Sequence, residues 1–323
     1  MKLLILGGTA FVGRHIAEAA LARGDEVTLF HRGRTRVPAF DKVETLLGDR
    51  DGDLSALAGS RTWDAVVDTS AYLPRVADAS SRLLADRAGI YAFLSTVSVY
   101  KDFSQVGITE QTPRAVIKEP LPDTVSNETY GALKARCERA AAAHFPGRLL
   151  IVRPGILIGP HDYTGRFAYW VRRVAEGGEM LAPGRPGSPL QVLDARDLAA
   201  FVLDRIDARD SVIYNATGPA EPLSWVGLFE DCEAATGVPV RMHWVEDERL
   251  SAAGVTGADL PLWIPAGPAT AGFYTVSSAK AVAVGLRHRP LAESIADVLA
   301  SAQGKAGMPR TREAELLRRF TGV

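Results

Sequence analysis

The sequence predicts an α/β fold in which a doubly wound, mainly parallel sheet carries a smaller C-terminal lobe. Short apolar runs alternate with amphipathic helical segments up to about residue 162, as in a parallel sheet with crossover helices. Beyond that point the alternation weakens, and residues 254–272 are rich in proline and glycine. A chain of 323 residues is long enough for both parts.

The first unit of the expected sheet reads KLLILGGTAFVGRHIAEAAL from Lys2 to Leu21. The apolar run Leu3 to Leu6 is typical of a strand buried on both faces, and a helix with apolar residues at helical spacing begins near Val12. Gly24 marks the end of this helix, and a second strand follows at Glu26 to Phe30. Together they form a β-α-β unit of about thirty residues.

This unit predicts a nucleotide-binding turn. Gly7 allows the chain to turn tightly, and Gly13 lets the helix pack closely on the strand. The first amides of the helix would then point at a pyrophosphate, which the helix dipole also favours. Because glycine turns also cap ordinary helices, an α/β domain that binds no nucleotide is the alternative interpretation. The expected contacts are Gly7, Thr9, Ala10, Phe11, Val12 and Gly13.

The end of the second strand, FHRGR from Phe30 to Arg34, indicates which cofactor is bound. A carboxylate there would accept a hydrogen bond from a ribose 2′-hydroxyl, whereas arginine suits a 2′-phosphate. Arg32 and Arg34 therefore predict NADP. NAD is the alternative, because surface arginines are often only solvated and NAD can bind without that carboxylate.

Further strands of the sheet are expected at 43–47, 64–68 and 90–94. The helices between them are expected at 54–58 and 76–86. Asp49 and Arg50 follow the first of these strands. Asp49 could accept a hydrogen bond from an adenine amino group or could cap the short helix. The small residues Thr69, Ser70 and Ala71 follow the next strand, where the backbone must pass the cofactor.

The strand at 90–94 ends in STVSVY, Ser95 to Tyr100. Thr96 and Ser98 are two residues apart, so one strand face could present both hydroxyls. Residues 101–125 have no clear period and many prolines and threonines, which is typical of a long surface loop that covers a site.

Tyr130 and Lys134 are four residues apart on a helix that we expect over 128–144, so they share one face. Tyrosine has an ordinary pKa of about 10 and is a poor acid or base at neutral pH, but a neighbouring ammonium lowers this pKa. Thr96 could hold a substrate oxygen while Tyr130 gives or takes a proton and a nicotinamide exchanges hydride at the adjacent carbon. The same pair also occurs by chance on many helix surfaces.

The remaining elements define the domain organisation. We expect strands at 149–152, 190–193 and 212–215, the last of them closing the main sheet, and helices at 167–176, 195–206, 224–236, 291–301 and 312–320. Residues 1–160 are the expected dinucleotide-binding core, to which 190–220 return. Residues 161–189 and 221–304 form the expected substrate lobe, and 305–323 a tail helix that docks on the surface.

Composition excludes several classes of protein. The formal net charge is −1 and no long block of one sign occurs, so neither a nucleic acid nor a membrane is an expected partner. Cys137 and Cys232 show no paired spacing, which fits a reducing compartment, and no residue pattern predicts a metal site. Because the first strand begins at residue 2 and no apolar run is long enough to span a membrane, we expect a cytoplasmic protein.

Four motifs together resemble the extended or atypical short-chain dehydrogenase/reductase family, which contains sugar epimerases and dihydroflavonol-type reductases. They are GGTAFVG, STVSVY, YGALK and RPGILIGP, within residues 1–220, with a weaker echo in RPLAESIADVLA near the end. The resemblance implies a Rossmann-type fold and a catalytic set of Thr96, Tyr130 and Lys134. It also implies that the segment of Pro154, Gly155 and Ile156 runs next to the nicotinamide.

The chain departs from this family's pattern in two places. The middle glycine of the turn is Ala10, which adds a methyl group near the pyrophosphate. Ile156 stands where classical nucleotide-sugar epimerases and dehydratases carry asparagine. With the arginines after the second strand, this favours an NADP-dependent reductase or dehydrogenase over an NAD-dependent sugar-nucleotide epimerase or dehydratase. A protein that senses NADP or binds RNA without catalysis is a third, less favoured interpretation.

Substrate contacts and assembly are the least specified features. We expect a small-molecule substrate that meets Tyr72, Ser98, His161 and Arg166, although the last two could equally be solvated loop residues. Similar proteins often form homodimers through the helix that carries the tyrosine. Small residues at Ala132, Ala135 and 140–143 would allow such close helix contact.

Overall fold

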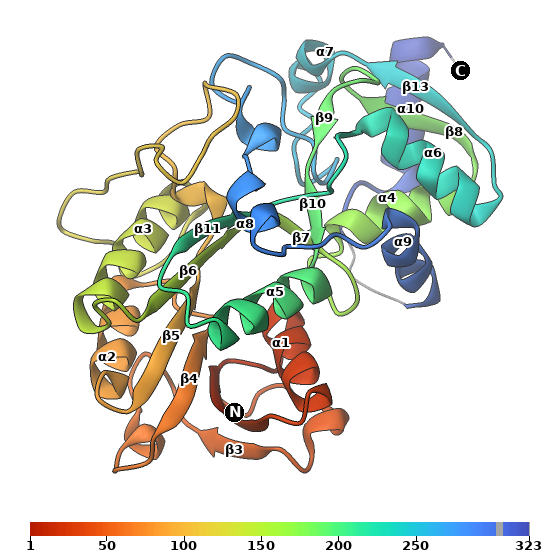
Figure 1. Ribbon diagram of the computed structural model, residues 1–323. Helices are drawn as coiled ribbons and strands as arrows, with labels where there is room; N and C mark the ends of the chain where they lie inside the picture. The colour runs from red at the N-terminus through yellow and green to blue at the C-terminus, as the bar shows by residue number, and fades with distance from the viewer. Residues whose placement is uncertain (302–305, 323) are drawn as a thin grey trace.

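A parallel sheet with helices on both faces forms the larger part of the molecule (Figure 1), as seen in a computed structural model that describes residues 1–301 and 306–322. Within these residues the main sheet has seven strands in the order β11-β6-β5-β4-β1-β2-β3. All of its neighbouring strands are parallel. Their bounds are Lys2–Leu6 (β1), Glu26–His31 (β2), Glu44–Leu47 (β3), Trp63–Asp68 (β4), Ala88–Leu94 (β5), Leu149–Pro154 (β6) and Ile213–Ala216 (β11). The predicted doubly wound fold is confirmed.

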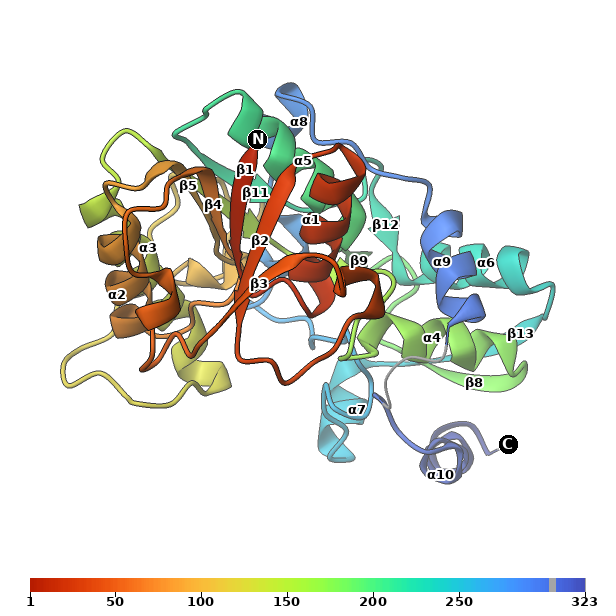
Figure 2. The same cartoon turned by 90° about the horizontal axis from the view of Figure 1, so that it is seen from below.

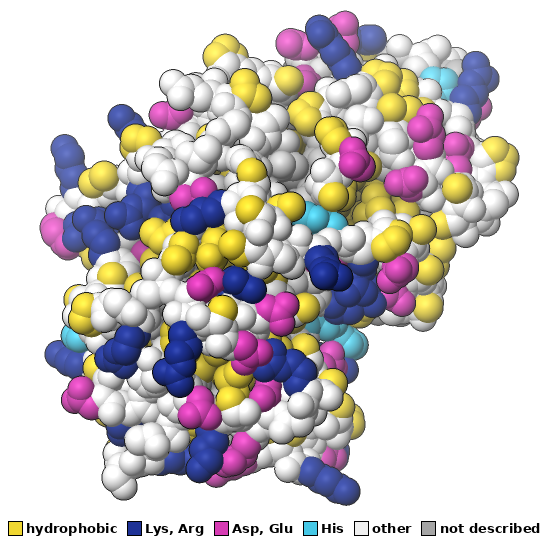
Figure 3. All heavy atoms as spheres, in the orientation of Figure 1, with side chains coloured by type: hydrophobic (Ala, Val, Ile, Leu, Met, Phe, Trp, Pro, Cys, Tyr) yellow, Lys and Arg dark blue, Asp and Glu magenta, His cyan; other side chains and the backbone are white. Residues whose placement is uncertain are grey.

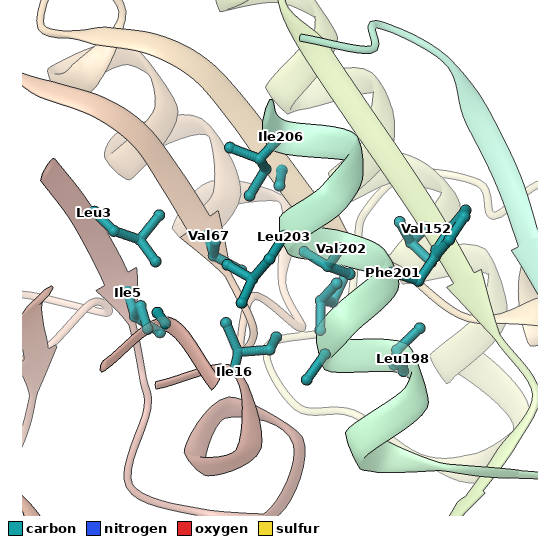
Figure 4. Packing of buried hydrophobic residues seen from close by; sticks show 14 of the residues in the cluster. Leu3, Ile5, Ile16, Val67, Val152, Leu198, Phe201, Val202, Leu203 and Ile206 are labelled. Atoms are coloured by element: carbon teal, nitrogen blue, oxygen red, sulfur yellow. The ribbon is translucent and has the colours of Figure 1, made fainter. Parts of the chain in front are cut away.

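Two helical layers cover this sheet, as Figure 2 shows. Helices α1 (Phe11–Ala22) and α5 (Ala195–Asp207) lie on one face, and α2 (Pro74–Leu84) and α3 (Asn127–His144) lie on the other. Leu3 and Ile5 of β1 belong to the core under α1 and α5 (Figure 4), whereas Leu4 and Leu6 belong to the core on the opposite face. A continuous apolar run is therefore required, because side chains alternate between two buried faces.

The C-terminal lobe has a core of its own, in which Trp170 is fully buried. Its parallel strands β8 (Gly178–Pro183) and β13 (Val240–Val245) pack with helices α4 (Arg166–Ala175), α6 (Trp225–Thr236), α9 (Leu291–Ala300) and α10 (Arg310–Thr321). Two small sheets join the lobe to the main sheet. They pair β7 (Ile156–Ile158) with β10 (Val192–Asp194) and β9 (Pro189–Leu190) with β12 (Leu223–Ser224). Short helices α7 (Asp247–Ala252) and α8 (Ala279–Ala283) complete the described part.

Most expected elements agree with the structure to within two residues at each end. The strand expected at 190–193 is instead two short strands in different sheets. Strands β8 and β13 were not predicted, although the alternation of Val240, Met242 and Trp244 with polar residues was a signal for β13. None of the described helices is long and apolar enough to cross a membrane.

The C-terminal helix α10 is part of the lobe core. Leu316 and Leu317 are buried there, and the buried carboxylate of Glu313 accepts hydrogen bonds from Arg173 of α4 and from the amide of Leu181 in β8. The helix is thus more than the surface attachment expected from its charged sequence. The boundary expected between residues 304 and 305 lies outside the described residues.

Candidate functional site

A cavity of about 420 Å³ opens where the strand order reverses, at the carboxyl ends of β1, β2 and β4. Its walls are the turn after β1, the end of β2, the segments after β3 and β4, and Tyr163 from the loop before α4. The predicted cofactor residues that line it are Gly7, Thr9, Ala10, Phe11, Val12, Arg32, Arg34, Asp49, Arg50, Thr69 and Ser70. Gly13, Ala71, Pro154, Gly155 and Ile156 are not among its lining residues.

The glycine turn packs too closely for larger residues. Gly7 has φ +113°, and a Cβ there would lie 2.4 Å from Oγ1 of Thr69. A Cβ on Gly13 would lie 2.9 Å from the amide nitrogen of Gly8, so the helix can approach the strand only with glycine at this position. Ala10, the N-cap of α1, has an extended backbone that any residue can adopt, and its side chain makes no capping hydrogen bond. The first amides of α1 are thus not capped by this side chain, and the first residues of the helix line the cavity, which fits a pyrophosphate.

The end of the cavity next to β2 carries exposed arginines, and we name it the adenosine end because the expected dinucleotide would place its adenosine there. Arg32 and Arg34 form no ion pair that the structure records with any described residue, and the end of β2 has no carboxylate. The neighbouring His31 accepts a hydrogen bond from the amide of Gly33 at 3.0 Å through Nδ1, which shapes this turn. The charge and the exposure of the two arginines fit a phosphate group at this end.

Arg50 is held mainly by the protein itself. Its Nη2 donates to Oδ2 of Asp68 at 2.7 Å and to Oγ of Ser80 at 2.6 Å, whereas its buried Nε has no hydrogen-bond partner in the structure. Burial acts to raise the pKa of Asp68, but the charge of Arg50 and the hydrogen bonds from Arg50 and Tyr91 together outweigh it and keep that pKa below its usual value. Asp49 accepts a hydrogen bond from the amide of Asp51 at 3.1 Å, so it also shapes its own loop. Asp68 was not predicted; its place at the end of the apolar run DAVVD was the available signal.

Helix α3 brings Tyr130 to Thr96. A Cβ on Gly131 would lie 1.9 Å from the carbonyl oxygen of Ser98, so α3 touches the turn after Thr96 only because residue 131 is glycine. Thr96 is 8% exposed, and its Oγ1 accepts a hydrogen bond from the amide of Ser98 at 3.1 Å. Its hydroxyl also lies near enough to the phenol of Tyr130 to act on its pKa, which it lowers. Folding therefore assembles two of the three expected catalytic side chains.

Lys134 is 2% exposed and lies beneath this pair. Its Nζ donates to the carbonyl oxygens of Ala71 at 2.9 Å and Leu94 at 2.7 Å, and it lies 4.1 Å from the ring centroid of Phe93. Burial lowers the pKa of Lys134 to about 8. Ala71 therefore contributes its backbone to the site, and its side chain is buried.

The pKa of Tyr130 differs from the expectation. Burial raises it above its ordinary value, and the nearby hydroxyl of Thr96 offsets this only in part. The ammonium of Lys134 is bonded to two backbone carbonyls instead of the phenol, which is why the expected lowering by Lys134 does not appear in this structure.

The expected substrate residues separate into two groups. Tyr72 lines the cavity with its ring centroid 6.3 Å from that of Tyr130, and the charge of Arg166 acts to lower the pKa of Tyr130, which places it on the same side. Ser98 donates its amide to Thr96. His161 lies elsewhere, with its ring centroid 5.7 Å from that of His15 over α1. Tyr163, from the same irregular stretch as His161 and Arg166, is exposed and lines the cavity.

Two further features bear on the site, namely metal binding and the segment expected next to the nicotinamide. Among the described residues no group of three or more His, Cys, Asp or Glu side chains is arranged to hold a metal ion. The stretch Pro154, Gly155 and Ile156 runs from the end of β6 into β7, where a Cβ on Gly155 would lie 3.0 Å from Cγ2 of Thr217. Its expected contact with a nicotinamide stays a prediction.

The chain is similar to two characterised relatives over parts of their lengths. It is 39% identical to the bifunctional pinoresinol-lariciresinol reductase of Forsythia intermedia over 59 residues, which are 18% of this chain and 19% of the reductase. It is 24% identical over 251 residues to the chloroplast stem-loop binding protein of 41 kDa b of Arabidopsis thaliana, covering 74% of this chain and 64% of that protein. The match thus spans less than two thirds of either relative.

Several solved structures share the fold over nearly the whole chain. A putative epimerase from Burkholderia cenocepacia J2315 has 21% identity and a TM-score of 0.67, with 93% of this chain and 97% of that chain covered. The UDP-N-acetylglucosamine 4-epimerase from Bacillus cereus has 17% identity and a TM-score of 0.67, with 92% and 95% covered. WbmH of Bordetella bronchiseptica, solved in complex with NAD+, has 17% identity and a TM-score of 0.67, with 100% of both chains covered. At these levels of sequence identity, the similarity shows only that the fold is shared.

The family is established by a match that covers most of the chain. The model of the NAD dependent epimerase/dehydratase family matches residues 3–216, which include the glycine turn, Thr96, Tyr130, Lys134 and the whole main sheet. The resemblance expected from the four motifs is confirmed. This protein therefore belongs to the NAD dependent epimerase/dehydratase family.

Proposed function

We propose that this enzyme oxidises or reduces an alcohol or carbonyl carbon of a small molecule, with Tyr130 as the general acid or base. One observation supports this proposal above the others. Gly131 allows α3 to touch the turn after Thr96, so that Tyr130 lies near this turn and beside Tyr72, which lines the cavity. A proton donor next to a hydroxyl that can hold the same substrate oxygen is the arrangement that this chemistry needs.

Each residue has a separate role in the proposal. Tyr130 gives a proton to the substrate oxygen, or takes one from it, and Thr96 holds that oxygen in place. Lys134 keeps a cation beneath the site through its two carbonyl contacts, and its lowered pKa of about 8 lets it exchange protons near neutral pH. The nicotinamide, when bound, would supply or accept the hydride.

Two net reactions remain, and different observations favour each. Family membership supports an NAD-dependent epimerase or dehydratase better than the reductase expected from the sequence. Sugar nucleotides are a candidate substrate class because some structural neighbours, such as the Bacillus cereus protein, are epimerases of such compounds. The second candidate is an NADP-dependent reductase, supported by Arg32 and Arg34 at the adenosine end.

Identification of the cofactor separates the two candidates. Freshly purified protein is denatured and any released nucleotide is identified, and the emptied protein is titrated with NADPH and NADH by fluorescence. Retained NAD supports the epimerase or dehydratase, and exchangeable binding that prefers NADPH supports the reductase. Binding of neither cofactor would contradict the whole proposal.

A nucleic-acid partner has little physical support, even though one relative is a stem-loop binding protein. The formal net charge is −1, and Figure 3 shows basic and acidic side chains interspersed over the visible face. Binding of RNA relies on clustered positive charge. We infer that the partner is a small molecule, and a filter-binding assay with a stem-loop RNA would test this, with no retention expected at physiological salt.

A homodimer through α3 is also proposed, but much of that helix is used within the chain. Ala132, Ala135 and Ala141 are buried inside the protomer. Ala142 and Ala143 are exposed and available for close contact, next to charged residues such as Arg139. Light scattering at working concentrations would test the assembly, and a monomeric mass would contradict it.

A further inference from the structure

The carboxylate of Glu138 joins the segments that carry the site residues. Glu138 follows Lys134 by one helical turn and is 1% exposed. It accepts hydrogen bonds from Oγ of Ser95 at 2.6 Å, from Nε and Nη2 of Arg153 at 2.8 and 2.7 Å, and from Nη1 of Arg114 at 3.0 Å. Four segments of the chain therefore meet at one side chain.

The turn that carries Thr96 is held at both ends by the same ion pair. On its N-terminal side, Ser95 donates to Glu138. On its C-terminal side, the phenol oxygen of Tyr100 accepts a hydrogen bond from Nη1 of Arg153 at 3.1 Å. Because these two partners enclose Thr96, movement of the ion pair would move the Thr96 hydroxyl.

A gain in stability alone does not explain why a buried ion pair is present here. Removing two charges from water costs several kcal/mol per ion, and apolar residues of the same volume often stabilise a core equally well. The buried pair Arg173–Glu313 shows that such a pair can serve lobe packing away from the site. The Glu138–Arg153 pair differs because its hydrogen bonds lead to Ser95 and Tyr100.

We propose that the Glu138–Arg153 ion pair is a positioning unit, which acts through Ser95 and Tyr100 to hold the Thr96 hydroxyl against the phenol of Tyr130. Helix α3 carries both Tyr130 and Glu138. A single rigid element therefore fixes the phenol and also the carboxylate that holds the Thr96 turn. Gly131 sets how close the helix lies, and Glu138 sets where the Thr96 turn lies along it. The inference rests on the proposed role of Tyr130 in catalysis.

The test measures the titration of Tyr130 without substrate or cofactor. Protein is labelled with a fluorinated tyrosine that titrates at lower pH than tyrosine, and its resonances are followed by fluorine NMR. The resonance of Tyr130 is identified by its absence in Tyr130→Phe. Ser95→Ala removes the hydroxyl that contacts Glu138 and leaves the ion pair in place. Ser294→Ala is the matched control, because Ser294 is also buried and donates to a buried carboxylate, Oδ2 of Asp194, at 2.6 Å.

Loss of the hydrogen bond between Ser95 and Glu138 should raise the pKa of Tyr130, because the nearby hydroxyl of Thr96 lowers that pKa and would be held less firmly. We expect a rise of about 0.5 to 1 pH unit in Ser95→Ala and no change in Ser294→Ala. Equal melting temperatures of the two variants would show that the rise is not a general loss of stability. An unchanged titration of Tyr130 in folded Ser95→Ala would overturn the proposal. Failure of the enzyme to turn over any substrate would contradict only the proposed function.

Discussion

The candidate site has two ends that are built in opposite ways. The candidate catalytic end is the cluster of Thr96, Tyr130 and Lys134 beside the cavity, and the adenosine end is the part of the cavity next to β2. At the catalytic end, Thr96 and Lys134 are buried, and each is already hydrogen-bonded to the protein. At the adenosine end, Arg32 and Arg34 are exposed, and the structure records no ion pair for them with described residues. If the proposed roles hold, the groups that meet a reacting atom are fixed by folding, whereas the groups that select a cofactor are left free to contact it.

Substitution of Tyr130 should have the largest effect, and it tests the catalytic end alone. Tyr130→Phe removes the proton donor and keeps the ring, so the rate of nicotinamide reduction or oxidation should fall by about 10²- to 10⁴-fold. Cofactor affinity, measured by fluorescence titration, should stay within about twofold because the cavity lining is unchanged. A variant that keeps its turnover would remove Tyr130 from the mechanism.

Substitution of Gly131 tests whether close packing assembles that end. In Gly131→Ala the added methyl group would collide with the carbonyl oxygen of Ser98, and the unfolding free energy should fall by about 1–3 kcal/mol. Gly227→Ala is the control, because a Cβ in that helix would meet its nearest neighbour, Oγ of Ser224, at an ordinary 3.4 Å. There alanine should stabilise the helix by up to about 1 kcal/mol. Denaturant unfolding measures both variants, and equal effects would contradict the packing argument.

The sheet was predictable and parts of the lobe were not, for a physical reason. Strands buried on both faces need continuous apolar runs such as Leu3–Leu6, which are visible in sequence. The lobe pairs very short strands, such as β9 and β12, whose two residues each give no periodic signal. Their pairing depends on contacts between distant parts of the chain.

The candidate site also has features that the sequence could predict and features that it could not. Thr96, Tyr130 and Lys134 could be identified from their spacing and from family motifs. The interactions of Asp68 and Glu138 could not be predicted, because their partners Arg50 and Ser95 are distant in sequence and come together only on folding. The raised pKa of Tyr130 was also beyond the sequence, since it depends on burial and on which groups Lys134 contacts.

Substitution of the exposed arginines tests the adenosine end. If Arg32 and Arg34 hold a 2′-phosphate, Arg34→Ala should weaken NADPH binding by about 10- to 100-fold and leave NADH binding within about twofold. Arg36→Ala is the control, because Arg36 is exposed, pairs with Asp41 and does not line the cavity. Fluorescence titration measures all three proteins. Equal weakening of both cofactors would mean that these arginines do not select between them.

The smallest expected effect concerns the burial of Lys134. Its pKa is about 8 in the folded state and near 10.5 when the chain is unfolded, so between these values the unfolded state binds more protons. Stability from this group therefore rises with pH above about 8. Above pH 9 the cysteines oppose it, because burial raises the pKa of Cys137 from 9.0 to about 12. The pH range in which Lys134 contributes without the opposing effect of the cysteines is therefore narrow. Between pH 8 and 9, the unfolding free energy of the wild type should rise relative to Lys134→Met by up to about 1 kcal/mol. Parallel pH profiles of the two proteins would mean that Lys134 is charged in the folded state throughout this range, and that the catalytic end holds a permanent cation.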